Sequence, residues 1–279
     1  MIKRIIVALD SDSDTQVATR HATEIAHRTG ARITGLAVVD TQSIDSSARG
    51  GGIGSFYYAE KLKSKLTEES REAARSLIAR FEKYMDKQDV EHVESVEEGV
   101  PFERIIEDLK YHDLLVIGKD PHFFYAHPKK ETHTLARVVK NTISPTLIVG
   151  NSYHEVKNVV VAYDGSASAA RSVQSLVQLR PFGDDISISL LNVYHGDSNE
   201  SKLLLELLSK YLTAHGFESK SRSMEGRKPD EEIIKYATEM KADLIVAGAH
   251  AVSAIKRMAF GSTTSALLND CDTPLFVDC

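Results

Sequence analysis

Residues 3–11 of the chain read KRIIVALDS, and residues 157–165 read KNVVVAYDG. In both copies a short apolar run rich in β-branched residues ends on an aspartate, Asp10 in the first and Asp164 in the second. A turn containing serine follows each aspartate. Apolar runs of this length and composition are typical of buried β-strands. The two stretches therefore predict the same strand at the start of two similar structural units.

A second pair of matching stretches follows in the same order, DLLVIG at 113–118 and DLIVAG at 243–248. Internal similarity that keeps its order along a chain indicates copies of one structural unit. We therefore expect one domain over residues 1–150 and a second over residues 151–279.

Strand-like and helix-like segments alternate through each half. The expected strands are 4–9, 31–39, 92–97, 114–117 and 146–149, then 159–163, 186–194, 218–224, 244–247 and 275–278. The expected helices are 15–28, 67–87, 101–109 and 134–141 in the first half, and they begin near Ser168, Ser198, Pro229 and Gly261 in the second. Alternation of this kind predicts the α/β class, with two tandem doubly wound parallel sheets of five strands each.

Residues 41–58 account for part of the extra length of the first half and include three consecutive glycines at 50–52. We expect a mobile surface loop there. This loop is either a tolerated insertion or a lid or partner-binding loop.

Composition narrows the function classes. A chain of 279 residues is long enough for two domains, and its net charge of -6 does not favour nucleic-acid binding. The sequence has no apolar run of about 18 residues, so we expect no membrane span, and the first strand follows Met1 too closely for a signal peptide. Cys271 and Cys279 form neither a disulfide framework nor a metal-ligand spacing. A reducing cytoplasm is the expected location.

The stretch after the fourth predicted strand of the second half has features of a phosphate-binding segment. It reads GAHA at 248–251, then nine residues, then GSTT at 261–264. A glycine at a strand end lets a ligand approach the backbone. A GSTT segment that opens a helix directs N–H groups and hydroxyls to one point, where the helix dipole favours an anion. Lys256 and Arg257 add positive charge between the two parts.

These residues resemble the universal stress protein family, whose phosphate-binding pattern is Gly-x2-Gly-x9-Gly-Ser/Thr. The chain keeps the spacing, with alanine in place of the second glycine: Gly248-x2-Ala251-x9-Gly261-Ser262. Other parts of the family pattern also match, namely Asp164-Gly165-Ser166, Val193, Gly226 to Pro229, and Asp243 to Val246. The resemblance covers nearly the whole chain, twice.

The resemblance implies an adenine nucleotide alpha hydrolase-like, Rossmann-like fold with a pocket for ATP or ADP, with or without Mg²⁺. Asp164 would hold the nucleoside end and Val193 would line the adenine. The remaining implied contacts, mainly to ribose and phosphates, are Gly165, Gly248, His250, Ala251, Gly261, Ser262, Thr263 and Thr264. The structural alternative is that Gly248 ends a strand, Ser262 caps a helix and Asp164 is a turn residue. If position 251 needs a positive φ, alanine there costs on the order of 1 kcal/mol.

The first half departs from the pattern. Its matching stretch reads GKDP at 118–121, and Glu131-Thr132 stands where Gly261-Ser262 stands in the second half. A carboxylate at the start of a helix would compete with phosphate for the N–H groups and repel it. The loop between is bulky and contains Phe123, Phe124 and Tyr125. We therefore predict that the first half does not bind ATP in the family manner, and that Asp10 and Val38 serve the fold. The spacing of its histidines, at 122, 127 and 133, matches no metal motif.

Three functions remain open. The first is a nucleotide-binding regulatory or stress-response protein without a catalytic centre. The second is a slow ATPase or nucleotidyl-transfer enzyme, for which Asp164, His250 and Lys256 are the nearby candidates. The third is an interaction module with a vestigial pocket.

Both halves end in a short apolar strand after a proline, PTLIV at 145–149 and PLFV at 274–277. A last strand tends to lie at a sheet edge, where it can pair with another strand. The resemblance implies that domains pair through this strand, so we expect an intramolecular pseudo-dimer of the two domains. A homodimer is the alternative.

Overall fold

The computed structural model describes residues 1–10, 14–48, 55–119, 121–123, 125–126, 134–248, 267 and 272–279. The chain divides into two compact units. The first unit is Lys3–Val138, and the second is Val139–Cys279 together with Met1–Ile2. Each unit is described by itself below.

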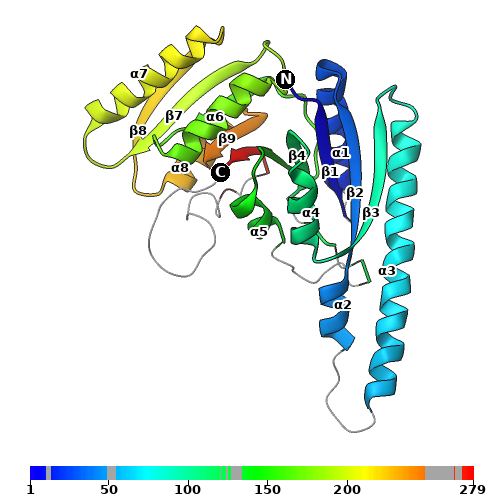
Figure 1. The fold of residues 1–279 in the computed structure, drawn as a ribbon. Helices are drawn as coiled ribbons and strands as arrows, with labels where there is room; N and C mark the ends of the chain where they lie inside the picture. Colours follow the sequence, from blue (N-terminus) through cyan, green and yellow to red (C-terminus); the bar gives the residue numbers. More distant parts are fainter. Residues whose placement is uncertain are drawn as a thin grey trace. The chain divides into compact units, whose positions relative to one another are not determined.

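The first unit contains a parallel sheet in the order β3-β2-β1-β4 (Figure 1). Its elements are β1 (Arg4–Leu9), α1 (Asp14–Thr29), β2 (Arg32–Asp40), α2 (Thr41–Ala48), α3 (Ser55–Met85), β3 (His92–Gly99), α4 (Pro101–Leu109) and β4 (Leu114–Gly118). The strands β1 and β4 are buried along almost their whole length. Burial on both faces explains why these strands are continuous apolar runs.

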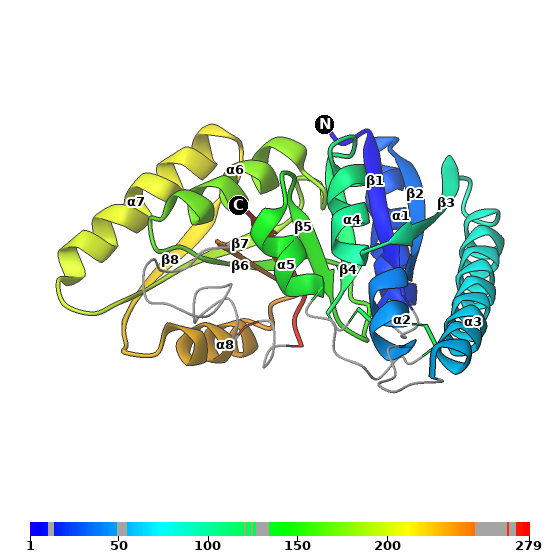
Figure 2. The same ribbon diagram turned by 60° about the horizontal axis from the view of Figure 1, so that its bottom comes forward.

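The second unit contains a six-stranded sheet in the order β5-β10-β9-β6-β7-β8. Its elements are β5 (Thr146–Val149), β6 (Asn158–Ala162), α6 (Ala167–Leu179), β7 (Ser187–Tyr194), α7 (Ser198–Ala214), β8 (Ser219–Glu225), α8 (Pro229–Glu239), β9 (Leu244–Gly248) and β10 (Leu275–Asp278), while α5 (Thr134–Asn141) spans the boundary between the units. The strands are parallel except for β5, which is antiparallel to β10. Figure 2 shows α6 and α7 on one face of this sheet and α8 on the other.

The predicted α/β class is confirmed, and the strands begin and end within about two residues of their expected positions. The predicted pairing of the two last strands is also observed. Leu147 of β5 lies opposite Phe276 of β10, and Ile148 lies opposite Leu275. Because of this pairing β5 belongs to the second compact unit, so the units do not coincide with the two halves of the sequence.

The expectation of a surface loop over residues 41–58 was wrong where the structure describes that stretch. Residues 41–48 form α2, and α3 begins at Ser55 rather than at Thr67. The helix α2 is stabilised at its start by Asp40, whose carboxylate accepts hydrogen bonds from the backbone N–H (2.9 Å) and the hydroxyl (2.6 Å) of Ser43. Ile44 of α2 is buried. The capping bonds and this apolar contact make the helix stable despite the glycines that follow it.

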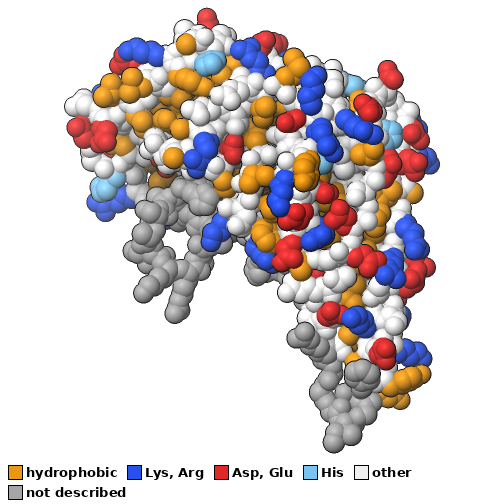
Figure 3. All heavy atoms as spheres, viewed as in Figure 1, with side chains coloured by type: hydrophobic (Ala, Val, Ile, Leu, Met, Phe, Trp, Pro, Cys, Tyr) orange, Lys and Arg blue, Asp and Glu red, His pale blue; other side chains and the backbone are white. Residues whose placement is uncertain are grey.

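Among the described residues, none of the helices combines the length and apolar character required to cross a membrane. Figure 3 shows hydrophobic side chains gathered over α7. Leu203 and Leu207 on this helix are 57% and 56% exposed.

Candidate functional site

The candidate site of the second half lies where β6, β7 and β9 end. Val161 of β6 is level with Val246 of β9, and Ala162 is level with Leu191 of β7. Since parallel strands end at the same edge of a sheet, the residues that follow these positions come close together. Asp164, Val193 and Gly248 are therefore brought to the edge at which doubly wound sheets bind ligands.

Asp164 begins the turn between β6 and α6, and its side chain is exposed. One of its carboxylate oxygens, Oδ1, accepts a hydrogen bond from the backbone N–H of Ser166 at 2.9 Å. Gly165 follows with φ +79°, in the left-handed region that favours glycine. Ser166 then caps α6, because its Oγ accepts the N–H of Ala169 at 3.2 Å. The sequence Asp-Gly-Ser thus forms a compact turn that presents a carboxylate to solvent beside a helix N-terminus.

The end of β7 is held by side-chain hydrogen bonds. The last bond between β6 and β7 runs from the Tyr163 N–H to the Leu191 carbonyl at 2.9 Å. Beyond it, the Tyr163 carbonyl accepts a hydrogen bond from Asn192 Nδ2 at 2.7 Å, and Asn192 Oδ1 accepts one from the hydroxyl of Ser201 at 2.6 Å. Val193 is half-buried at this point. These bonds hold the backbone next to Val193, the residue that the family resemblance would place against the adenine.

Gly248 has a packing role that accounts for the glycine without a ligand. A Cβ at this position would lie 2.6 Å from the backbone nitrogen of Ala169 and 2.6 Å from the Oγ of Ser168. The end of β9 therefore packs directly against the first turn of α6. Ser172 strengthens this contact, because its hydroxyl donates to the Ala247 carbonyl at 2.7 Å and its Oγ accepts the N–H of Asp278 at 2.8 Å.

The phosphate side of the predicted site lies outside the described residues, apart from Gly248. This applies to His250, Ala251, Gly261, Ser262, Thr263 and Thr264 in the second half, and to Glu131 in the first. Their predicted roles stay predictions.

Asp10, the first-half equivalent of Asp164, has the opposite surroundings. Its side chain is 1% exposed. Its Oδ1 accepts a hydrogen bond from the hydroxyl of Thr15 at 2.5 Å, and its Oδ2 accepts one from the backbone N–H of His122 at 3.0 Å. The two carboxylate oxygens are thus bonded to the chain itself.

Tyr125, which follows β4 in the chain, lies at the strand ends of the first half that correspond to the site. Tyr125 is 7% exposed, and its hydroxyl donates to the Leu9 carbonyl at 3.0 Å and accepts the N–H of Val38 at 3.1 Å. Burial raises the pKa of Tyr125, and the carboxylates of Asp10 and Asp40 raise it further, so the phenol keeps its proton. Sequence reasoning identified the bulk of this segment but missed its hydrogen bonds, because they join residues far apart in the chain.

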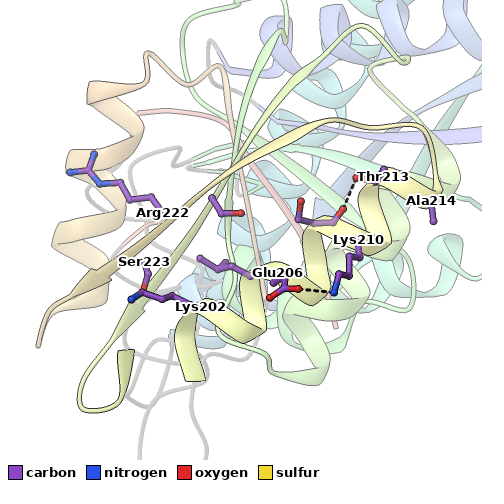
Figure 4. A pocket seen from close by; sticks show the side chains of 10 residues that line it. Lys202, Glu206, Lys210, Thr213, Ala214, Arg222 and Ser223 are labelled. Atoms are coloured by element: carbon purple, nitrogen blue, oxygen red, sulfur yellow. Dashed lines mark hydrogen bonds and ion pairs between the residues drawn. The ribbon is translucent and has the colours of Figure 1, made fainter. Parts of the chain in front are cut away.

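A groove of about 900 Å³ lies between α7 and β8 (Figure 4). Its lining residues are Lys202, Leu205, Glu206, Ser209, Lys210, Thr213, Ala214, Ser221, Arg222 and Ser223. None of the predicted nucleotide-site residues is among them. Small side chains on β8 leave this space open, and Lys210 is paired with Glu206 at 2.6 Å, so the two charges offset each other. Arg222 is likewise paired, with Glu239 at 2.9 Å.

Comparison with known proteins gives a consistent result over both halves. A sequence model of the universal stress protein family matches residues 1–149 and again residues 155–277. A universal stress protein of Synechocystis sp. is 24% identical over 287 residues, which cover 98% of this chain and 99% of that protein.

Two solved structures share the fold over almost their full length. A universal stress protein from Archaeoglobus fulgidus is 16% identical, with a TM-score of 0.65 and coverage of 98% of this chain and 97% of that one. A functionally unknown protein from Pseudomonas aeruginosa is 13% identical, with a TM-score of 0.64 and coverage of 99% and 92%. At these identities the likeness concerns the fold alone.

Proposed function

This chain belongs to the universal stress protein family, and on that premise we propose that it is a regulatory or stress-response protein that binds ATP or ADP at one site, in its second half. The observation that carries the proposal is the opposite state of the two equivalent aspartates. Asp164 is exposed, whereas Asp10 is 1% exposed and bonded to its own chain. The cytoplasmic location stays a prediction.

The described residues of the second half fit the nucleoside end of an adenine nucleotide. The exposed Asp164 carboxylate can accept hydrogen bonds from hydroxyl groups of a ligand, because its one hydrogen bond to the described part of the chain is the bond from the Ser166 N–H to Oδ1. Val193 offers an apolar surface for a flat base at the end of β7. The phosphates would be held by Gly248 with Ala251, Gly261, Ser262 and Thr263, as the sequence pattern predicts.

Isothermal titration of the full chain with ATP and with ADP, each with and without Mg²⁺, tests the proposal. We expect saturable binding with one nucleotide per chain. A stoichiometry of two would contradict the assignment to the second half alone. Absence of both heat and competition would remove nucleotide binding and leave the interaction module. Single-turnover hydrolysis in the same samples distinguishes a binding protein from a slow ATPase.

A further inference from the structure

The hydroxyl of Tyr125 lies between the ends of two neighbouring strands. The pairing of β1 with β2 ends with Leu9 opposite Ala37. The phenol oxygen then contacts the Leu9 carbonyl and the amide of Val38, one residue further along β2, at 3.0 and 3.1 Å. A tyrosine hydroxyl offers one donor and can accept in return. The side chain of Tyr125 therefore makes, within its own chain, the hydrogen bonds that a bound phenol would make.

The position of this ring has an equivalent in the second half. The repeat aligns Leu9 with Tyr163, and Val38 with Val193. Val193 is the residue assigned above to the adenine wall. The hydroxyl of Tyr125 thus contacts the two backbone positions of the first half that correspond to Tyr163 and Val193 in the second.

We propose that the first half contains a second ring-binding site, which the chain occupies with Tyr125 and which accepts a free aromatic ring carrying a hydroxyl when that side chain is removed. Only the comparison with adenine rests on the proposed function. The site itself is defined by the carbonyl of Leu9 and the amide of Val38.

The occupying segment is anchored just before the ring contact, at His122 and Phe123. The N–H of His122 donates to Asp10 Oδ2 at 3.0 Å, and Phe123 is fully buried. Since these anchors do not involve the Tyr125 side chain, truncation at position 125 should leave the segment attached and a cavity in its place. A cavity of this kind binds small ligands that match its shape and its hydrogen-bonding groups.

The test is titration of Tyr125→Ala with phenol, which has the shape of the ring and hydroxyl that the substitution removes, and with benzene, which lacks the hydroxyl. We expect phenol to bind the variant with a stoichiometry of one and to raise its Tm. Benzene should bind about tenfold more weakly or worse, because it leaves the Leu9 carbonyl and the Val38 amide unpaired. Wild type and Tyr111→Ala, which removes a tyrosine that is 69% exposed, are the controls and should bind neither compound.

Equal binding of phenol and benzene by Tyr125→Ala, no binding by the folded variant, or equal binding by the controls would overturn the proposal. If Tyr125→Ala does not fold, Tyr125→Phe keeps the ring and removes only the hydroxyl. Hydrogen exchange at the Val38 amide should then be about tenfold faster than in wild type. An unchanged exchange rate would overturn the proposal as well. Failure of ATP to bind wild type would refute the proposed function and leave these results standing.

Discussion

The internal repeat provides a matched pair of substitutions, Asp10→Ala and Asp164→Ala. The two aspartates occupy the same position after the first strand of their halves, but one is buried and bonded while the other is exposed. We predict that the first substitution lowers stability and leaves ATP binding intact. The second should leave stability nearly intact and weaken ATP binding.

The magnitudes follow from the hydrogen bonds. Asp10→Ala removes the acceptor for the Thr15 hydroxyl and for the His122 N–H, at 2.5 and 3.0 Å. Each bond to a charged group is worth roughly 1.5–3 kcal/mol. Removal of a buried carboxylate also removes its desolvation cost. We therefore expect a net loss of about 2–4 kcal/mol in the free energy of unfolding, from these opposing effects.

Asp164→Ala removes one bond to the Ser166 N–H at 2.9 Å in a solvent-exposed turn. Since water can replace an exposed partner, the loss should not exceed about 1 kcal/mol. If this carboxylate holds the nucleoside through one or two charge-assisted hydrogen bonds, the affinity for ATP should fall at least about tenfold.

The chain has no tryptophan, so urea unfolding is followed by far-UV circular dichroism, and hydrogen exchange identifies which unit is affected. ATP affinity is measured by calorimetry on the same samples. Equal stability losses in the two variants would refute the reasoning from burial. Loss of ATP binding in Asp10→Ala but not in Asp164→Ala would refute the placement of the site.

Three further predictions concern single residues. Gly248→Ala should lower the free energy of unfolding by about 1–3 kcal/mol, because its Cβ would lie 2.6 Å from the backbone nitrogen of Ala169. The control is Gly150→Ala, whose Cβ would have no atom nearer than 3.3 Å. Equal Tm values for the two variants would contradict the packing role of Gly248. Burial lowers the pKa of His112 below its usual 6.5, so the unfolded chain takes up the proton at a higher pH than the folded chain. The free energy of unfolding should therefore fall as the pH drops below 6.5. An equally steep fall in His112→Gln would exclude this histidine as the cause. Burial raises the pKa of Cys279 to about 11, so little of its thiol is ionised at pH 8.5 in the folded protein. In a variant that lacks Cys271, alkylation of Cys279 at pH 8.5 should be about 100-fold slower in the folded protein than in the protein unfolded in urea. Equal rates would show an accessible thiolate.

Local pattern was sufficient for the strands and for most of the helices. A buried parallel strand is recognisable from its own residues, and a proline at the first helical position marked the starts of α4 and α8 at Pro101 and Pro229. The helix α2 was missed because the glycines at 50–52 dominate its surroundings. Its stability comes from Asp40 and from the burial of Ile44, which depends on a neighbouring helix. Such tertiary contacts cannot be predicted from the local hydrophobic periodicity of a sequence.

The residues that the two halves share are explained by folding in both of them. Gly118 and Gly248 end matching strands, and a Cβ at either would collide with the first turn of the helix that follows the first strand of its half, at Asp14 of α1 and at Ala169 of α6. The shared aspartate, in turn, bonds to its own chain in the first half. An aspartate and a glycine in this spacing are therefore features of the scaffold and not by themselves a sign of a nucleotide site. Ligand specificity must then come from the segments that follow β4 and β9, as is usual where loops carry function on a common fold. In the first half that segment contributes Tyr125, whose hydroxyl bonds to the backbone of Leu9 and Val38. We therefore expect a half of this chain to bind a nucleotide only when its aspartate is exposed and no side chain of its own lies at the position of Tyr125.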